Sequence, residues 1–223
     1  RSSIYIYPGS TLTSAQAQNY TNDGFEIGVH VLTDCNNYSL SVLQLQYTVQ
    51  LAEFASRFPT LPQQDSERTH CIAWSGWAYQ AEIKEEKGIR LDTNYYYWPS
   101  SWINDRPGFF TGSGMPMRFA DLDGAMFDVY QATTQMTDES GQSYPDNINT
   151  LLSRALGAEG YYGVFTANMH SDNLNSPSSD AIVAAAQTNS VPVVSGRQLL
   201  EWIDGRNFSA FSGITWNGNA LDF

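Results

Sequence analysis

The chain has 223 residues, a length that suits one large domain, and it carries a formal net charge of −12 at pH 7. Its 11 lysines and arginines form no basic cluster and no apolar run is long enough to cross a bilayer, which argues against nucleic-acid binding and a membrane span. Aromatic residues make up 13% of the chain, so rings are numerous enough for a core and a binding surface. The acidic charge favours a cationic polymer as partner, or serves solubility alone.

The N-terminal part of the chain predicts strands that alternate with helices. Apolar runs predict strands over residues 2–7, 25–31, 68–74 and 89–97. Periodic apolar positions predict helices over residues 14–20, 41–58 and 77–87. Ser14 is expected to cap the first helix, Pro59 to stop the second, and Gly88 to follow the third.

The C-terminal part continues this alternation after a loop-like stretch at residues 99–114. Strands at residues 117–120 and 127–132 are expected to form a hairpin through a turn at 121–124. Further strands and helices are expected over residues 146–156 (helix), 163–169 (strand), 178–188 (helix), 191–194 (strand) and 195–202 (helix). This spacing predicts βαβ units and a parallel sheet, either closed into a barrel or open and doubly wound.

The three histidines of the chain, His30, His70 and His170, each lie at or near the end of an apolar run. Parallel sheets deliver catalytic side chains at the carboxyl ends of their strands, so the three are expected to share a site. His30 and His70 are candidate metal ligands, the alternative being hydrogen-bonded core residues, and Asp34 is either a carboxylate ligand or a loop acid. His170 is a candidate general acid, with Asp128 as its carboxylate neighbour or as a buried structural residue.

Aromatic residues follow the predicted strand at residues 89–97. Tyr97 and Trp98 lie nearest the loop, where exposed rings can stack on the faces of sugars. The alternative is a buried aromatic corner.

Cys35 and Cys71 are the only cysteines, and each follows one of the first two histidines closely. If both histidines meet at one site the cysteines lie near each other, so we expect a disulfide and an oxidising compartment, the alternative being two buried thiols. Sequons at Asn19, Asn37 and Asn207 add weak support for a secreted glycoprotein.

Residues 24–30, Gly-Phe-Glu-Ile-Gly-Val-His, resemble the second motif of polysaccharide deacetylases with the NodB-homology fold, in which the run ends on a metal-binding histidine. Residues 68–70 with Trp74, and then residues 88–94, resemble a divergent branch of these carbohydrate esterases, similar to the fungal galactosaminogalactan deacetylases that act on a biofilm exopolysaccharide. Residues 164–170 resemble the late strand that carries the catalytic histidine. The resemblance spans roughly residues 20–205.

This resemblance implies an α/β fold, a distorted (β/α) barrel, with one divalent metal ion, expected to be zinc, held by an Asp-His-His set. His30 and His70 are then the metal ligands, His170 is the acid, and Arg90 or Arg68 orients the base. The implied reaction hydrolyses the N-acetyl groups of an acetylated hexosamine polysaccharide outside the cell or at the cell wall. The residues expected to bind substrate are Trp74, Asp92, Tyr97 and Trp98.

Two departures from the family pattern shape these expectations. Asp34 stands where the family has its second histidine, so His70 is taken as the second ligand. The aspartate pair of the first motif has no match in the 23 residues before Gly24, so we expect the base and the carboxylate ligand in a further N-terminal part of the polypeptide. Residues 1–205 are then a partial barrel lacking its N-terminal strands, residues 206–223 begin a β-rich appendage, and residues 1–223 alone are expected not to release acetate.

Two other functions remain open from the residues. One is a carbohydrate-binding or scaffold protein on a degenerate barrel whose histidines hold no metal. The other is a glycoside hydrolase that uses two carboxylates, with Asp92 and Asp128 as the candidates.

Overall fold

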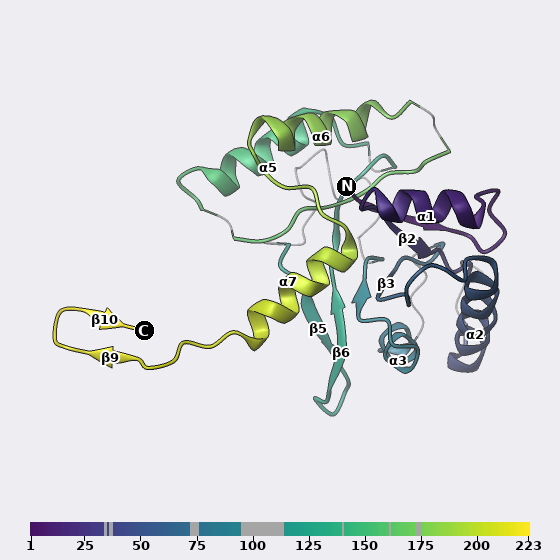
Figure 1. The fold of residues 1–223 in the computed structure, drawn as a ribbon, viewed down its shortest axis with the longest axis horizontal. Coiled ribbons are helices and arrows are strands. Elements are labelled where there is room, and N and C mark those ends of the chain that lie inside the picture. The colour runs from purple at the N-terminus through teal and green to yellow at the C-terminus, as the bar shows by residue number, and fades with distance from the viewer. Residues whose placement is uncertain are drawn as a thin grey trace.

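The computed structural model describes residues 1–33, 35, 38–71, 76–94, 114–139, 141–160, 162–172 and 175–223. Within these residues the chain is a mixed α/β protein with six helices and several small sheets (Figure 1). The sheets formed by the described strands do not close into a barrel. No helix in the described part of the chain is both long and apolar enough to cross a membrane.

The N-terminal elements form a βαβ unit. Strand β1 (Ser3–Ile6) pairs in parallel with β2 (Glu26–Val29), and helix α1 (Ser14–Asn22) connects them. Thr13, rather than the expected Ser14, is the N-cap of α1: its side chain accepts from the Gln16 amide, and the Gln16 side chain accepts from the Thr13 amide. The longest helix, α2 (Leu40–Arg57), is capped by Ser39 and buries Leu43, Tyr47 and Phe54.

The central strands continue the parallel arrangement. An isolated parallel bridge between Leu32 and His70 joins the end of the β2 segment to the segment after β3 (Ser66–Glu67). Beyond it the strand order is β3, β4 (Leu91–Asp92), β6 (Met126–Gln131) and β5 (Met117–Ala120), in which only the β5–β6 hairpin is antiparallel. Helix α3 (Tyr79–Glu86) contacts α2 and β6.

The C-terminal elements form a second packed group. Strand β7 (Thr134–Thr137) pairs in parallel with β8 (Thr166–Asn168), and helices α5 (Asp146–Leu156) and α6 (Pro177–Thr188) contact each other. Met136 of β7 lies in one apolar cluster with Leu151 of α5 and Ala185 of α6. Helix α7 (Gly196–Phe208), capped by Ser195 as expected, contacts β3 and β4.

Three of the differences from the sequence-based expectations lie in the C-terminal part of the chain. The expected strand at residues 191–194 is irregular, and Val193 and Val194 are exposed. Strand β7 was not expected because its sequence, Thr-Gln-Met-Thr, is mostly polar, yet all four residues are buried. Helix α7 continues through Phe208, past the expected boundary at residue 205.

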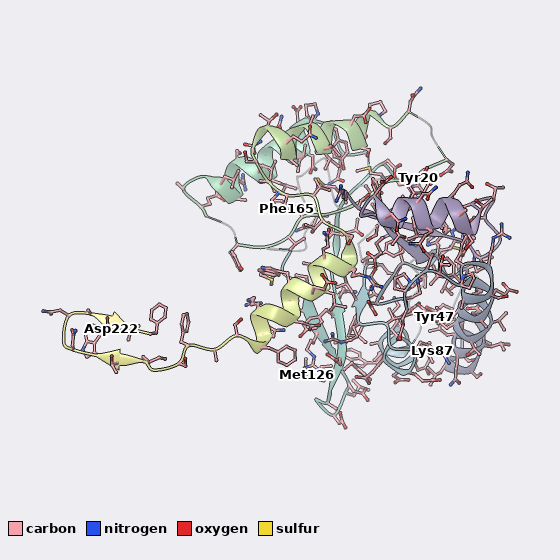
Figure 2. All side chains as sticks on the ribbon, viewed as in Figure 1. Tyr20, Tyr47, Lys87, Met126, Phe165 and Asp222 are labelled. Carbon is pink, nitrogen blue, oxygen red and sulfur yellow. A yellow bond between two sulfur atoms is a disulfide. The ribbon has the colours of Figure 1, made fainter. Side chains whose placement is uncertain are left out.

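The last residues stand apart from the rest of the protein. Residues 205–223 are all exposed, and a short antiparallel hairpin joins β9 (Thr215–Trp216) to β10 (Leu221–Asp222). Figure 2 shows Asp222 in this extension, well away from the other labelled residues. The hairpin agrees with the expected β-structure of this stretch.

A cluster of buried charges ties α2 and α3 to the central strands. Lys84 of α3 forms ion pairs with Glu67 of β3, at 2.9 Å, and with Asp92 of β4, and none of the three side chains is exposed. The hydroxyl group of Tyr47, on α2, donates to Glu67 at 2.8 Å (Figure 2). Burial acts to lower the pKa of Lys84, but the two carboxylates outweigh it and raise that pKa, so the lysine stays charged.

Replacing Lys84 by methionine removes the cation and leaves Glu67 and Asp92 buried without it. We expect Lys84→Met to lower the free energy of unfolding by about 3–5 kcal/mol, the usual cost of breaking one side of a buried ion pair. The matched control is Lys87→Met, because Lys87 pairs with Glu86 at 2.9 Å in a partly exposed position and should cost less than about 1 kcal/mol. Urea unfolding measures both, and equal losses would contradict the role given to Lys84.

Candidate functional site

Three consecutive parallel segments each deliver one ring to the same edge of the sheet. Tyr7 follows β1, His30 follows β2, and His70 follows β3, where its amide donates to the Val31 carbonyl at 2.7 Å. The rings of His30 and His70 lie with centroids 5.8 Å apart and almost perpendicular, at 83°. The centroid of the Tyr7 ring lies 4.9 Å from that of the His30 ring and 5.9 Å from that of the His70 ring. The expected meeting of His30 and His70 is therefore found, together with a tyrosine that was not expected.

Hydrogen bonds orient both histidine rings through their Nδ1 atoms. Nδ1 of His30 lies 2.6 Å from the Arg68 carbonyl oxygen, which can only accept, so Nδ1 carries the proton and Nε2 is left as the acceptor. Nδ1 of His70 lies 2.9 Å from the Tyr7 hydroxyl. Burial lowers the pKa of His30 to about 4, aided by the nearby charges of Arg68, His70 and His170. His30 is therefore a neutral imidazole at pH 7, the form that binds metal ions.

His170 forms a pair with a carboxylate from the neighbouring segment. It follows β8, and its Nδ1 lies 2.8 Å from Oδ1 of Asp138, which follows β7. The His170 amide donates to the other oxygen of Asp138 at 2.9 Å. Burial acts to lower the pKa of His170, but Asp138, Glu139 and Asp172 outweigh it and raise that pKa.

Electrostatic effects connect the His170 segment to His30 and Tyr7. The charge of His170 acts on His30, and the charge of Asp172 acts on Tyr7, whose pKa is raised by burial and then by this carboxylate. The ends of β1, β2 and β3 thus bring Tyr7, His30 and His70 into contact, and the ends of β7 and β8 bring Asp138 and His170 together within electrostatic range of them. The pKa values of two of these imidazoles are shifted in opposite directions, down at His30 and up at His170.

Asp128 was the candidate for the carboxylate partner of His170, with a structural role as the alternative, and the structure gives Asp138 as the partner. Asp128 pairs with Arg90, whose Nε donates to it at 2.8 Å, and Arg90 also binds Asp204 of α7. Arg90 precedes β4 and Asp128 lies early in β6, so both are at the amino ends of the strands. The histidines are at the carboxyl ends, and this placement argues against catalytic roles for Arg90 and Asp128.

The remaining predicted site residues have the following positions. Asp92 is fully buried against Lys84, which removes it from any surface that binds a polymer. Asn19 is exposed on α1, while the side chain of Asn207 donates to the Tyr130 hydroxyl at 2.7 Å. The predicted residues that lie outside the described residues are Asp34, Asn37, Trp74, Tyr97 and Trp98.

The expected disulfide between Cys35 and Cys71 is present, with Cα atoms 5.2 Å apart. Among the described residues, the only group of three ligand-type side chains close enough to hold a metal ion is Cys35, His70 and Cys71. Sulfur atoms joined in a disulfide are not thiolates and do not bind zinc in that way. In the oxidised protein the chemistry of the site therefore offers His30 and His70 as metal ligands, and no carboxylate of the described residues joins them in such a group.

The opposite pKa directions of His30 and His170 can be tested in metal-free protein. With three histidines in the chain, NMR of the imidazole nitrogens should resolve each one. We expect His30 to titrate near pH 4 and His170 above its ordinary value of about 6.5. Asp138→Asn should lower the pKa of His170, whereas the same change at Asp128 should leave it unmoved. A response to the Asp128 variant alone would contradict the pairing.

The depressed pKa of His30 also predicts how stability depends on pH. The unfolded chain binds this proton near pH 6.5, before the folded protein does, so stability falls as the pH drops from about 6.5 towards 4. His30→Asn keeps a donor for the Arg68 carbonyl but does not titrate. Denaturant midpoints measured across this range should fall less in the variant than in the wild type.

Comparisons with known proteins found no matching family, no matching curated protein and no matching solved structure.

Proposed function

We propose that the protein is a metal-dependent hydrolase of the N-acetyl groups of a hexosamine polysaccharide. The observation that carries this proposal is the pair of imidazoles, His30 and His70, at the carboxyl ends of adjacent parallel segments, within electrostatic reach of the His170–Asp138 pair. Metal-assisted hydrolysis of an amide needs both elements, a site for an electrophile and an acid for the departing nitrogen.

His30 and His70 fit the role of metal ligands. His30 is neutral, and its Nδ1 proton is directed to a backbone carbonyl, as it is in most metal-binding histidines. His70 is oriented by the Tyr7 hydroxyl in the same way if its Nδ1 donates. A bound divalent ion would supply polarisation of the acetamide carbonyl and an activated water. Two ligands leave positions for a further ligand, for water and for substrate.

His170 fits the role of general acid. The nearby carboxylates raise the pKa of His170 and so favour the protonated ring, and Asp138 holds the ring through Nδ1. Nε2 then remains to give its proton to the amine that leaves when the amide bond breaks. Asp138 is a positioning residue in this scheme, because it acts through His170.

The substrate class rests on the resemblance of residues 24–30 to the deacetylase motif and on the charge of the chain. A net charge of −12 attracts a polymer that gains free amines as it loses acetyl groups. The disulfide agrees with an oxidising environment such as the cell exterior. We propose zinc as the metal, because imidazole ligands suit it.

A glycan-binding protein without catalysis is the second candidate. It is favoured by one observation, that no carboxylate of the described residues joins His30 and His70 in a three-ligand group. The two-carboxylate glycoside hydrolase has no such support, because Asp92 is buried in an ion pair with Lys84.

The two candidates differ in metal binding by the oxidised chain. We expect about one equivalent of zinc per chain, lost in His30→Ala and in His70→Ala because each removes a ligand. His170→Ala is the matched control and should keep the metal. Elemental analysis after dialysis against dilute zinc measures this, with circular dichroism to confirm that each variant folds.

Acetate release from an acetylated hexosamine polymer by the full-length protein then tests the reaction itself. His170→Ala should lower the rate about 10²–10⁴-fold, the usual contribution of a general acid. Oxidised wild-type protein that binds the polymer but no zinc would overturn the hydrolase proposal in favour of the glycan-binding protein.

A further inference from the structure

The disulfide Cys35–Cys71 lies directly beside His70. When it is reduced, the same place holds two thiol groups and an imidazole. The two sulfur atoms and one ring nitrogen of His70 all lie within 4.8 Å of one another. Cys35 is exposed, and Cys71 and His70 are partly exposed, so a small reductant and a metal ion can reach all three. We propose that reduction of this disulfide creates a zinc site formed by Cys35, Cys71 and His70, which shares only His70 with the site proposed above.

The ligand set suits zinc better than the other common divalent ions. Two thiolates and one imidazole form a known tetrahedral zinc set whose fourth position is taken by water. Thiolates disfavour magnesium and calcium, which prefer oxygen ligands. Tetrahedral zinc places its ligand atoms roughly 3.5–4 Å apart, given bonds of about 2.3 Å to sulfur and about 2.0 Å to nitrogen. Once the sulfur atoms separate, the three atoms need small movements to reach those distances.

The backbone around the three ligands is held by contacts that do not involve the disulfide. The amide of His70 donates to the Val31 carbonyl at 2.7 Å, and the Thr33 hydroxyl donates to the His70 carbonyl at 2.6 Å. On the other side, the Gln50 side chain of α2 accepts from the Leu32 amide at 2.7 Å and donates to the Leu32 carbonyl at 2.9 Å. The segments that carry Cys35 and Cys71 therefore stay adjacent after the S–S bond breaks.

The reduction is a balanced two-electron step. A water-soluble trialkylphosphine attacks one sulfur and breaks the S–S bond, and hydrolysis of the adduct yields the phosphine oxide and two thiols. Water supplies the oxygen atom and both protons, and the phosphine is oxidised. Zinc then binds the two sulfurs as thiolates and releases two protons. In a cell the thiol form exists before oxidative folding, because the reducing cytosol keeps cysteines as thiols.

The test compares zinc binding by oxidised and phosphine-reduced protein without oxygen, using a chromogenic zinc chelator as competitor. In His30→Ala, where the site proposed above has lost a ligand and His70 remains for the sulfurs, we expect reduction to add about one equivalent of zinc per chain. Cys35→Ser and Cys71→Ser should each abolish the addition, and His70→Ala should weaken it about tenfold or more. Cobalt in place of zinc should give the near-ultraviolet absorption of a thiolate–metal bond in the reduced wild type, but not in the oxidised protein or in the two cysteine variants.

His30→Ala separates this proposal from the proposed function. It should lose any zinc held by the oxidised protein, yet keep the zinc that reduction adds, because His30 is not a ligand of the new site. Circular dichroism of the reduced protein checks that the fold persists, which we expect because the hydrogen bonds of Thr33 and Gln50 do not depend on the disulfide. The proposal is overturned if reduction unfolds the chain, adds no zinc, or adds zinc that survives in Cys35→Ser.

Discussion

The pairing between the end of the β2 segment and the segment after β3 is the constraint on which the site depends. One parallel bridge, Leu32 to His70, brings the carboxyl ends of the two segments together. Because His30 precedes this bridge and His70 is part of it, their rings meet within 5.8 Å. The same pairing brings Cys35 and Cys71 close enough for a disulfide. The disulfide and the two histidine rings therefore lie on the same two neighbouring segments, and the covalent bond restricts how far these segments can separate.

Beneath this edge the protein contains buried charges in place of apolar packing. Glu67, two residues before Thr69, lies against Lys84, and Asp92 holds the amide side chain of Asn94 at 3.1 Å. Asn94 in turn accepts from the Thr69 amide at 2.7 Å, directly before His70. Buried ion pairs add little net stability compared with apolar residues of the same size, but they allow few alternative arrangements. Such a network suits the support beneath the site, which must hold the backbone beside His70 in one position.

The two halves of the site differ in how burial and charge act on an imidazole. At His30, burial is the largest effect and the surrounding charges are positive, so the neutral ring is favoured. At His170, three carboxylates outweigh burial and favour the cation. Environments that push the pKa values of two like groups apart are a usual sign of an acid and its counterpart in one site. The contrast arises from the partners of each ring, since both follow similar short strands.

Much of the local structure was determined by the sequence alone. Helix α5 begins and ends where its apolar period predicts, Ser195 caps α7, and the histidines follow apolar runs. These features depend on neighbours a few residues away, which periodicity and capping rules report. The strand expected at residues 89–97 pairs only over Leu91–Asp92 of β4, and β3, at Ser66–Glu67, lies just before the expected strand at residues 68–74, because an apolar run does not mark which residues pair.

Only the tertiary structure decided which side chains share the site. Asp138 replaces Asp128 as the partner of His170 because β7, a strand of polar but buried residues, lies beside β8. Tyr7 joins the histidines because β1 pairs with β2, and Arg90 is directed to the amino ends by Asp204 of α7. A sequence shows which residues end a strand, but the neighbours of that strand are set by long-range pairing. For this protein, the sequence therefore determined the candidate ligands, and the fold determined their partners.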